Sequence, residues 1–216
     1  MHGFLVMEFV WGRPVAAGQV DASFLDYAAR YLAHLAHAPA AGIPMPQEEL
    51  LRMIEVNVTE GLGASWSHRF ARANLHIPPA DAVPAATDGR MMLHEWLRTG
   101  RGYLKTDAVD HAADHFSPGC RDTAWDLAAC LVEWGLDRPQ QNFLLGQYRT
   151  VAGDTTLPRR LPFYTIAYLA HRLGYAALAA QMLGPHSLDG QRFQTLLARY
   201  TSRLQPELVR IQSPSQ

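Results

Sequence analysis

A single helix that is apolar on nearly every side constrains the fold of this chain more than any other segment. Asp122 is a good helix N-cap, and an apolar run follows it over residues 125–136, with Trp125 on one face and Leu131 on another. Such a helix must be enclosed by other elements, so we expect it at the centre of its domain. Asp126 lies in its first turn. We expect this carboxylate to be buried and to accept hydrogen bonds from the backbone of a neighbouring loop.

The other segments also predict mostly helices. Strand-like segments are few: an apolar run at 4–10, ended by a turn at 11–14, and two short segments at 90–97 and 102–106 that form a hairpin. Pro162 suits the first turn of a helix, and we expect the tail after Pro206 to be frayed. The predicted fold class is mainly α (α+β). Apolar spacing and capping residues predict further helices at 21–37, 47–60, 65–74, 140–151, 161–183 and 188–204.

Composition excludes several classes of protein. The chain has 216 residues, 48% of them hydrophobic, which is enough for one domain with a real core. Its formal net charge is −1 and no basic face is evident, so we expect no nucleic-acid partner. No apolar run approaches the roughly 18 residues that a membrane span needs, and the start lacks the cationic region of a signal peptide. With Cys120 and Cys130 poorly placed for a bridge, a reduced, cytoplasmic protein is predicted.

Acidic residues, histidines and the only lysine of the chain gather between residues 104 and 129. Carboxylates bind hard cations and imidazole binds borderline ones, whereas burying many carboxylates without a cation is costly. The stretch therefore predicts a site for a metal or a metal–phosphate complex. The simpler alternative is a solvated loop followed by a capped helix. The residues concerned are Lys105, Asp107, Asp110, His111, Asp114, His115, Asp122 and Asp126.

The order of elements and two motifs resemble the C-terminal lobe of the aminoglycoside phosphotransferase and choline kinase group, a branch of the kinase-like fold. G-F-L-V-M-E-F-V-W-G-R-P at 3–14 is similar to that family's hinge, which lines the adenine pocket. D-T-A-W-D-L-A at 122–128 is similar to its G-D-P-A-x-D-L-A segment, where the first acid caps the helix and the second anchors the catalytic loop. The resemblance implies a hinge-like strand at 1–14, a helical lobe at 15–210 with its site at 90–126, and a tail at 211–216.

The catalytic motif departs from the family's pattern. The family has H-G-D, with an Asn five residues after the Asp. The nearest match here is His94-Glu95-Trp96, with Arg101 where the Asn would be. The pattern D-G-R-M-x-x-H-E-W, followed by L-K-T-D-A-x-D-H, spans 88–111 and also resembles a divergent branch of this group.

The resemblance implies roles for individual residues. L-K-T-D at 104–107 is similar to the strand that delivers the family's metal-binding Asp, so Asp107 is expected to bind Mg²⁺ together with Asp110, with Asp114 as a substitute. The residues expected to act in catalysis, by orienting the acceptor, are Glu95, His94 and Asp114. The residues expected to contact ATP are Glu8, Val10 and Lys105, with His111 as an alternative to Lys105 at the phosphate.

These roles predict a small-molecule phosphotransferase-like protein, incomplete or degenerate, that uses ATP and Mg²⁺ to phosphorylate a hydroxyl on a small substrate. The family's N-terminal lobe, with its glycine loop and ATP-holding lysine, is absent from the sequence. A strand at the very start would leave apolar surface uncovered, so we expect a missing N-terminal lobe or a homodimer.

Two alternative functions stay open. One is a non-catalytic helical binding module. The other is a metal-dependent phosphohydrolase in which His111 and His115, spaced i and i+4, bind one metal, although Pro118 and Gly119 disfavour a helix there.

Overall fold

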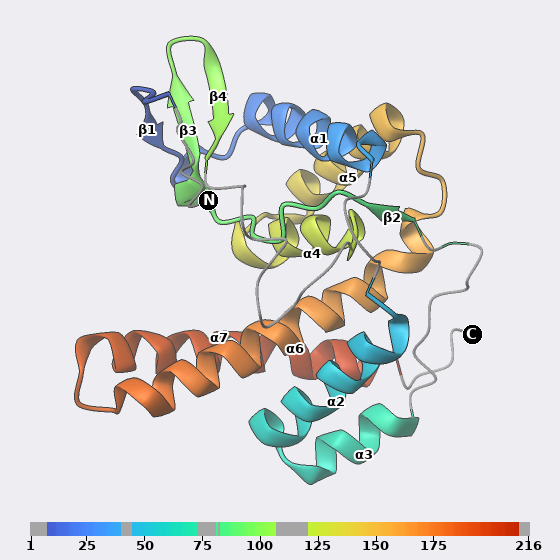
Figure 1. The fold of residues 1–216 in the computed structure, drawn as a ribbon, viewed down its shortest axis with the longest axis vertical. Helices are drawn as coiled ribbons and strands as arrows, with labels where there is room; N and C mark the ends of the chain where they lie inside the picture. The colour runs from blue at the N-terminus through green and yellow to red at the C-terminus, as the bar shows by residue number, and fades with distance from the viewer. Residues whose placement is uncertain (1–7, 40–44, 73–80, 82, 107–120, 212–216) are drawn as a thin grey trace, which may run out of the picture.

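The computed structural model describes residues 8–39, 45–72, 81, 83–106 and 121–211 (Figure 1). Within these ranges the lobe is mainly helical with two small antiparallel sheets, so the predicted fold class is confirmed. One sheet has the order β1-β3-β4, and in the other β2 pairs with β5. The helices are α1 (Ala22–His37), α2 (Gln47–Leu62), α3 (Ala64–Arg72), α4 (Ala124–Glu133), α5 (Arg138–Ala152), α6 (Leu157–Leu183) and α7 (Leu188–Arg210). The strands are β1 (Arg13–Pro14), β2 (Pro84–Ala85), β3 (Trp96–Thr99), β4 (Gly102–Lys105) and β5 (Arg121–Asp122).

Helix α4 lies at the centre, as its apolar character predicts. In Figure 1 it lies between the α1–α5 layer and the long helix α6. The Trp134 side chain just after α4 is 1% exposed, and its Nε1 donates to the Met91 carbonyl at 2.6 Å. Its ring contacts Phe24 of α1 and Trp96 of β3, at centroid distances of 5.1 and 6.0 Å. These aromatic contacts join the central helix to α1 and to the sheet.

The N-terminal strand is not where the sequence indicated. Residues 8–10, the described part of the expected strand, form no strand, and β1 lies instead at Arg13–Pro14, where a turn was expected. β1 pairs with β3 at one edge of the sheet, with Arg13 opposite Arg98. Proline has no N–H to donate, and an edge strand tolerates this because only one side of the strand is paired.

Helices α6 and α7 extend further than predicted, and each contains a proline. α6 begins at Leu157, where the Asp154 carboxylate accepts the Leu157 N–H at 2.9 Å, so Pro162 lies inside the helix and not in its first turn. α7 continues through Pro206 to Arg210, so the expected frayed tail is wrong for these residues. Leu208 is fully buried, and such packing offsets the helical hydrogen bond that a proline removes.

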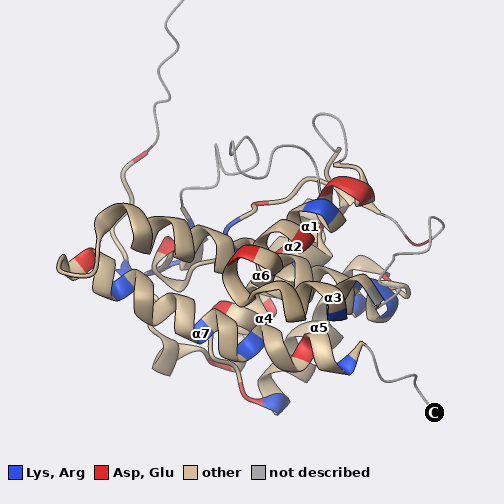
Figure 2. Ribbon diagram, turned by 90° about the horizontal axis from the view of Figure 1, so that it is seen from below, with Lys and Arg blue, Asp and Glu red and all other residues tan. Residues whose placement is uncertain are grey.

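None of the helices in the described ranges combines the length and apolar character that crossing a membrane requires. Figure 2 shows acidic and basic positions interspersed along these helices.

Helices α2 and α6 approach closely at Gly61. The sequence predicted a helix over 47–60 that Gly61 and Gly63 end. The helix runs through Gly61 to Leu62, and Gly63, with φ of 90°, is the C-cap. A Cβ added at Gly61 would lie 2.6 Å from Cδ2 and 2.9 Å from Cγ of Leu173 on α6. Glycine therefore permits the two helices to pack at this distance.

We expect Gly61→Ala to lower the free energy of unfolding by about 1–3 kcal/mol, because the fully buried Leu173 has to move. Gly146→Ala on α5 is the matched control, since an added Cβ there meets nothing within 4 Å. The control should raise stability by about 0.5–1 kcal/mol, as alanine is the better helix former. Urea unfolding measures both variants, and equal stabilities would contradict the close approach of α2 and α6.

Candidate functional site

Asp126 fixes a backbone loop against the start of α4. Its side chain is fully buried, and its Oδ2 accepts the Asp88 N–H at 2.8 Å while Oδ1 accepts the Gly89 N–H at 2.9 Å. The expectation that Asp126 accepts hydrogen bonds from loop backbone is confirmed. The loop that it holds is at 88–89, whereas the nearest sequence match to the family's catalytic loop was at 94–96.

Local sequence explains why the backbone turns here. Gly89 has a φ of 82°, a region that glycine adopts without steric cost. The Asp88 Oδ1 accepts the Arg90 N–H at 3.3 Å, an Asx-type turn contact. Trp125 of α4 also contacts the loop, because its Nε1 donates to the Gly89 carbonyl at 3.4 Å.

Lys105 joins two carboxylates beside this loop. Its Nζ lies 3.1 Å from Asp88 Oδ2 and 3.1 Å from Glu95 Oε2, and it donates to the Thr106 carbonyl at 2.9 Å. The side chains of Lys105, Asp88 and Glu95 are 2%, 0% and 4% exposed. Strand pairing explains why Lys105 and Glu95 lie close together. Lys105 lies opposite Trp96 in the β3–β4 ladder and is therefore next to Glu95.

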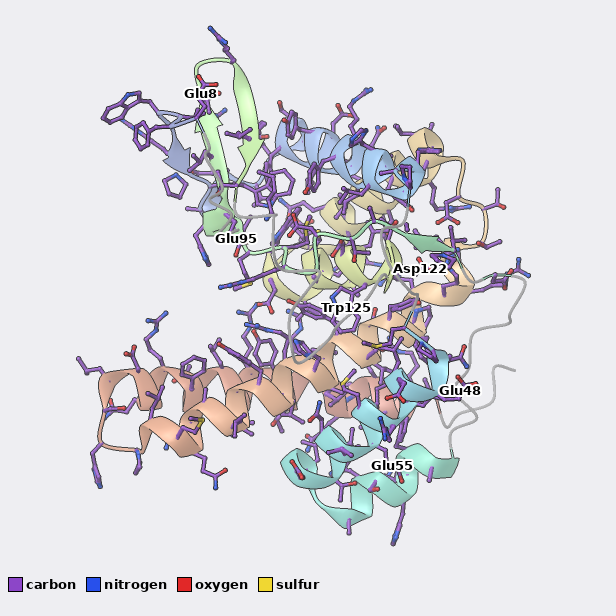
Figure 3. All side chains as sticks on the ribbon, viewed as in Figure 1. Glu8, Glu48, Glu55, Glu95, Asp122 and Trp125 are labelled. Atoms are coloured by element: carbon purple, nitrogen blue, oxygen red, sulfur yellow. The ribbon has the colours of Figure 1, made fainter. Side chains whose placement is uncertain are left out.

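Arg90 and His94 border the cluster on its solvent side. Arg90 is 47% exposed, and its Nε lies 3.0 Å from Glu95 Oε1. His94 is 64% exposed, with its Nε2 3.9 Å from the same oxygen. Figure 3 shows Glu95 at the base of the β3–β4 hairpin.

Tyr31 of α1, which is partly buried against the core, also bonds to the cluster. Its hydroxyl donates to Asp88 Oδ2 at 2.7 Å. Burial, and then the nearby Asp88 carboxylate, raise the pKa of Tyr31 well above its ordinary value. The hydroxyl therefore stays a neutral donor throughout the physiological pH range.

The residues predicted for the site have different places in the structure. Glu95 and Lys105 are brought together, and His94 lies at the rim. Glu8 is exposed and Val10 is half-buried, and in Figure 3 Glu8 appears near the turn of the hairpin, away from Glu95 at its base. Within the described ranges no group of three or more His, Cys, Asp or Glu side chains is arranged to bind a metal. The predicted residues Asp107, Asp110, His111, Asp114 and His115 lie outside the described residues.

The sequence did not indicate Asp88, Arg90 and Tyr31 as site residues. Asp88 and Gly89 predicted a turn, Arg90 the start of a strand-like segment, and all three residues of 88–90 belonged to the D-G-R pattern. An acidic residue directly before a glycine turn was the available signal, since such a carboxylate both shapes the turn and stays near it. Tyr31 gave no signal, because helical spacing places it among the core residues of α1.

A second buried ion network fixes the start of α4 to α6. Arg160 is fully buried and donates through Nε and Nη2 to both oxygens of Asp122, at 2.6 and 3.0 Å, and through Nη2 to Asp154 at 2.7 Å. Asp122 also accepts the Ala124 N–H at 2.8 Å, although Thr123 is the N-cap. Burial raises the pKa of Asp154, but the hydrogen bonds and charge of Arg160 outweigh it, so the pKa is lowered. A pocket of about 350 Å³ lies beside Asp154, but its carboxylate is already bound to Arg160.

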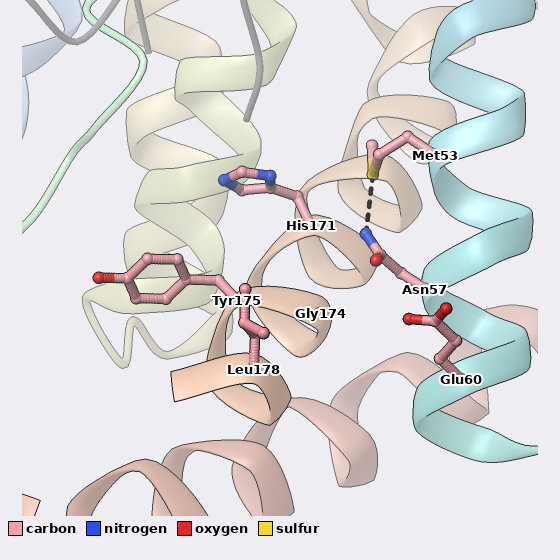
Figure 4. Close-up of a pocket in the computed structure, with 7 residues that line it drawn as sticks. All are labelled: Met53, Asn57, Glu60, His171, Gly174, Tyr175 and Leu178. Atoms are coloured by element: carbon pink, nitrogen blue, oxygen red, sulfur yellow. Dashed lines mark hydrogen bonds between the residues drawn. The ribbon is translucent and has the colours of Figure 1, made fainter. Parts of the chain in front are cut away.

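Another pocket, of about 210 Å³, lies between α2 and α6 (Figure 4). One aromatic residue connects it to the loop, because the Trp125 ring contacts the His171 ring at 5.6 Å while its Nε1 bonds to Gly89. The pocket is lined by Met53, Asn57 and Glu60 of α2 and by His171, Gly174, Tyr175 and Leu178 of α6.

Comparison with known proteins identifies the fold. Neither a protein-family model nor a curated protein sequence matches this chain. The structure is similar to that of the choline kinase LicA from Streptococcus pneumoniae, with a TM-score of 0.59 and 14% sequence identity. The match covers 90% of this chain and 69% of that one. The fold is kinase-like. At this identity the likeness concerns the fold alone.

We expect Asp126→Ala to destabilise the protein by about 1–3 kcal/mol, because the Asp88 and Gly89 N–H groups lose a buried acceptor. Asp26→Ala is the matched control, since Asp26 lies on α1 and its pair with Arg30 is exposed. The control should change stability by at most about 0.5 kcal/mol. Thermal and urea unfolding measure both, and an Asp126→Ala variant as stable as the control would contradict the assigned role.

Proposed function

We propose that this protein is a kinase-like phosphotransferase that transfers a phosphoryl group from ATP to a hydroxyl group of a small molecule. The observation that supports it is the contact of Asp126 with the Asp88 and Gly89 N–H groups, in a chain with a kinase-like fold. In the family that the sequence resembles, the acid at this place in the motif anchors the catalytic loop. We therefore assign residues 88–90 to that loop.

Glu95 is the carboxylate proposed to orient the acceptor hydroxyl. Lys105 holds its Oε2, while Oε1 faces the half-exposed Arg90. Phosphoryl transfer requires positive charge at the transferred group, and the Arg90 guanidinium is placed to provide it. Lys105 is a weaker candidate for contact with phosphate, because its ammonium would first have to leave Asp88 and Glu95.

The pocket between α2 and α6 is the proposed acceptor site. It is lined by the Glu60 carboxylate and the Tyr175 ring, and among the described residues neither Lys nor Arg lines it. A carboxylate and an aromatic ring attract a small cation. The similar structure is named a choline kinase, and an amino alcohol of that kind has both the positive charge and the hydroxyl group that this proposal needs.

ATP and Mg²⁺ enter the proposal through the resemblance. Glu8 and Val10 are the proposed contacts to the nucleotide, and Asp107 and Asp110, outside the described residues, are the proposed metal ligands. The described carboxylates nearest the loop do not fit a divalent ion, because Asp88 and Glu95 already bind Lys105.

A non-catalytic binding module is the second candidate. The observation in its favour is that Asp88, Glu95 and Lys105 are almost fully buried and paired with one another. A carboxylate in such a cluster has to be uncovered before it can meet a substrate. A binding module of this kind would bind a ligand in the α2–α6 pocket without transferring a phosphoryl group.

Nucleotide binding and phosphoryl transfer separate these candidates. We expect calorimetry to detect binding of Mg²⁺-ATP, and labelled ATP to yield a phosphorylated product from a panel of amino alcohols that includes choline. Glu95→Gln should lower kcat by about 10²-fold or more while nucleotide binding persists, because it removes a group that acts on the acceptor. Glu49→Gln, at an exposed position of α2, is the matched control and should leave kcat unchanged.

Nucleotide binding without transfer to any acceptor would favour the binding module. Absence of both binding and transfer would contradict the proposed phosphotransferase.

A further inference from the structure

The ammonium of Lys105 lies between two buried carboxylates, in the kind of place where proteins bind divalent cations. We propose that Lys105 is a built-in counter-cation. Asp88 and Glu95 then bind no divalent metal ion in this protein, and the chain itself supplies the positive charge at this place. The inference concerns cations alone and does not depend on the proposed phosphotransferase activity.

The atoms around Lys105 Nζ are those of a hard-cation site. Among the described residues, four oxygens lie around it: Oδ1 and Oδ2 of Asp88 at 3.2 and 3.1 Å, Oε2 of Glu95 at 3.1 Å and the Thr106 carbonyl at 2.9 Å. Carboxylate and backbone carbonyl oxygens are the ligands that Mg²⁺ and Ca²⁺ prefer, at about 2.0–2.6 Å. The longer distances seen here are those of N–H···O hydrogen bonds, so the set is spaced for an ammonium.

Within the part of the chain that the structure describes, the charges of these ion pairs balance without a metal. Asp88 and Glu95 contribute two negative charges, and Lys105 and Arg90 contribute two positive charges at distances of 3.0–3.1 Å. The nearby Asp126 carboxylate is committed to two backbone N–H groups. A divalent ion added to this cluster would lie beside the Lys105 ammonium in a nearly dry environment, where like charges repel strongly. Removal of the ammonium would instead leave two buried carboxylates short of positive charge.

The lysine is fitted to its position. An ammonium has three N–H donors, and three residues accept them: Asp88, Glu95 and Thr106. Lys105 is the only lysine of the chain, and a planar guanidinium would present its donors as a wide fork in this compact space. Hydrogen bonds that do not involve Lys105 also hold these acceptor residues in place. The Tyr31 hydroxyl donates to the Asp88 carboxylate, and the Thr106 hydroxyl and N–H both donate to the Glu95 carbonyl.

Counting bound Mn²⁺, with no nucleotide present, tests the inference. Electron paramagnetic resonance gives the number of ions bound per chain, and thermal unfolding gives their effect on stability. Lys105→Met should melt below the wild type in EDTA, bind one more Mn²⁺ than the wild type and regain stability as Mn²⁺ is added. The double variant K105M/E95Q should lose that additional ion. Arg30→Met, which removes an exposed cation from its pair with Asp26, is the matched control and should bind as the wild type does.

Two further variants keep the test decisive if Lys105→Met does not fold. Lys105→Gln removes the charge but keeps an amide donor for the carboxylates, and it should bind the additional ion. Glu95→Gln alone should leave the number of Mn²⁺ ions bound by the wild type unchanged. A folded Lys105 variant that binds no additional ion, or a Glu95→Gln variant that binds fewer ions than the wild type, would overturn the proposal.

Discussion

Two hydrogen bonds to one buried carboxylate connect the core of this lobe to its candidate site. Asp126 lies on the central helix α4, and it holds the Asp88 and Gly89 N–H groups at 2.8 and 2.9 Å. Removal of this carboxylate would leave two backbone N–H groups without their acceptor, and unsatisfied buried donors cost about 1–3 kcal/mol. Because the backbone at 88–89 is fixed, the Asp88 side chain is presented to Tyr31 and Lys105, and Lys105 in turn fixes Glu95.

Local patterns in the sequence predicted the elements, and long-range contacts decided the site. Helical spacing located α1 and α4, and the isolated charge of Asp126 in an apolar helix predicted its buried role. The contacts that define the site join distant residues: Asp88 and Asp126 are 38 positions apart, as are Asp122 and Arg160, and Tyr31 is 57 positions from Asp88. Such pairs leave no periodic pattern in a single sequence. The β3–β4 hairpin, by contrast, is a local element that joins residues close in the sequence. Its strand pairing brings Lys105 next to Glu95.

The cluster of Lys105, Asp88 and Glu95 is relevant both to the proposed phosphotransferase activity and to the proposed role of Lys105 as a counter-cation. A kinase-like fold with an anchored loop supports phosphoryl transfer, whereas the closed pairing of Lys105 with Asp88 and Glu95 restricts how that chemistry proceeds. If the ammonium is the resident cation, any metal that accompanies a nucleotide must be held by other residues or by the phosphates themselves. Arg90, half-exposed at 3.0 Å from Glu95, is then the cationic group that a phosphate can reach first.

Amide hydrogen exchange of Asp88 and Gly89, followed by NMR, tests the Asp126 contact most directly. Both amides should exchange as slowly as amides of the buried α4 core such as Ala128, because they open only when the carboxylate releases them. The Gly100 amide, in the exposed turn of the hairpin, provides the fast reference within the same molecule. Exchange of Asp88 and Gly89 as fast as that of Gly100 would contradict the claim that Asp126 anchors this loop.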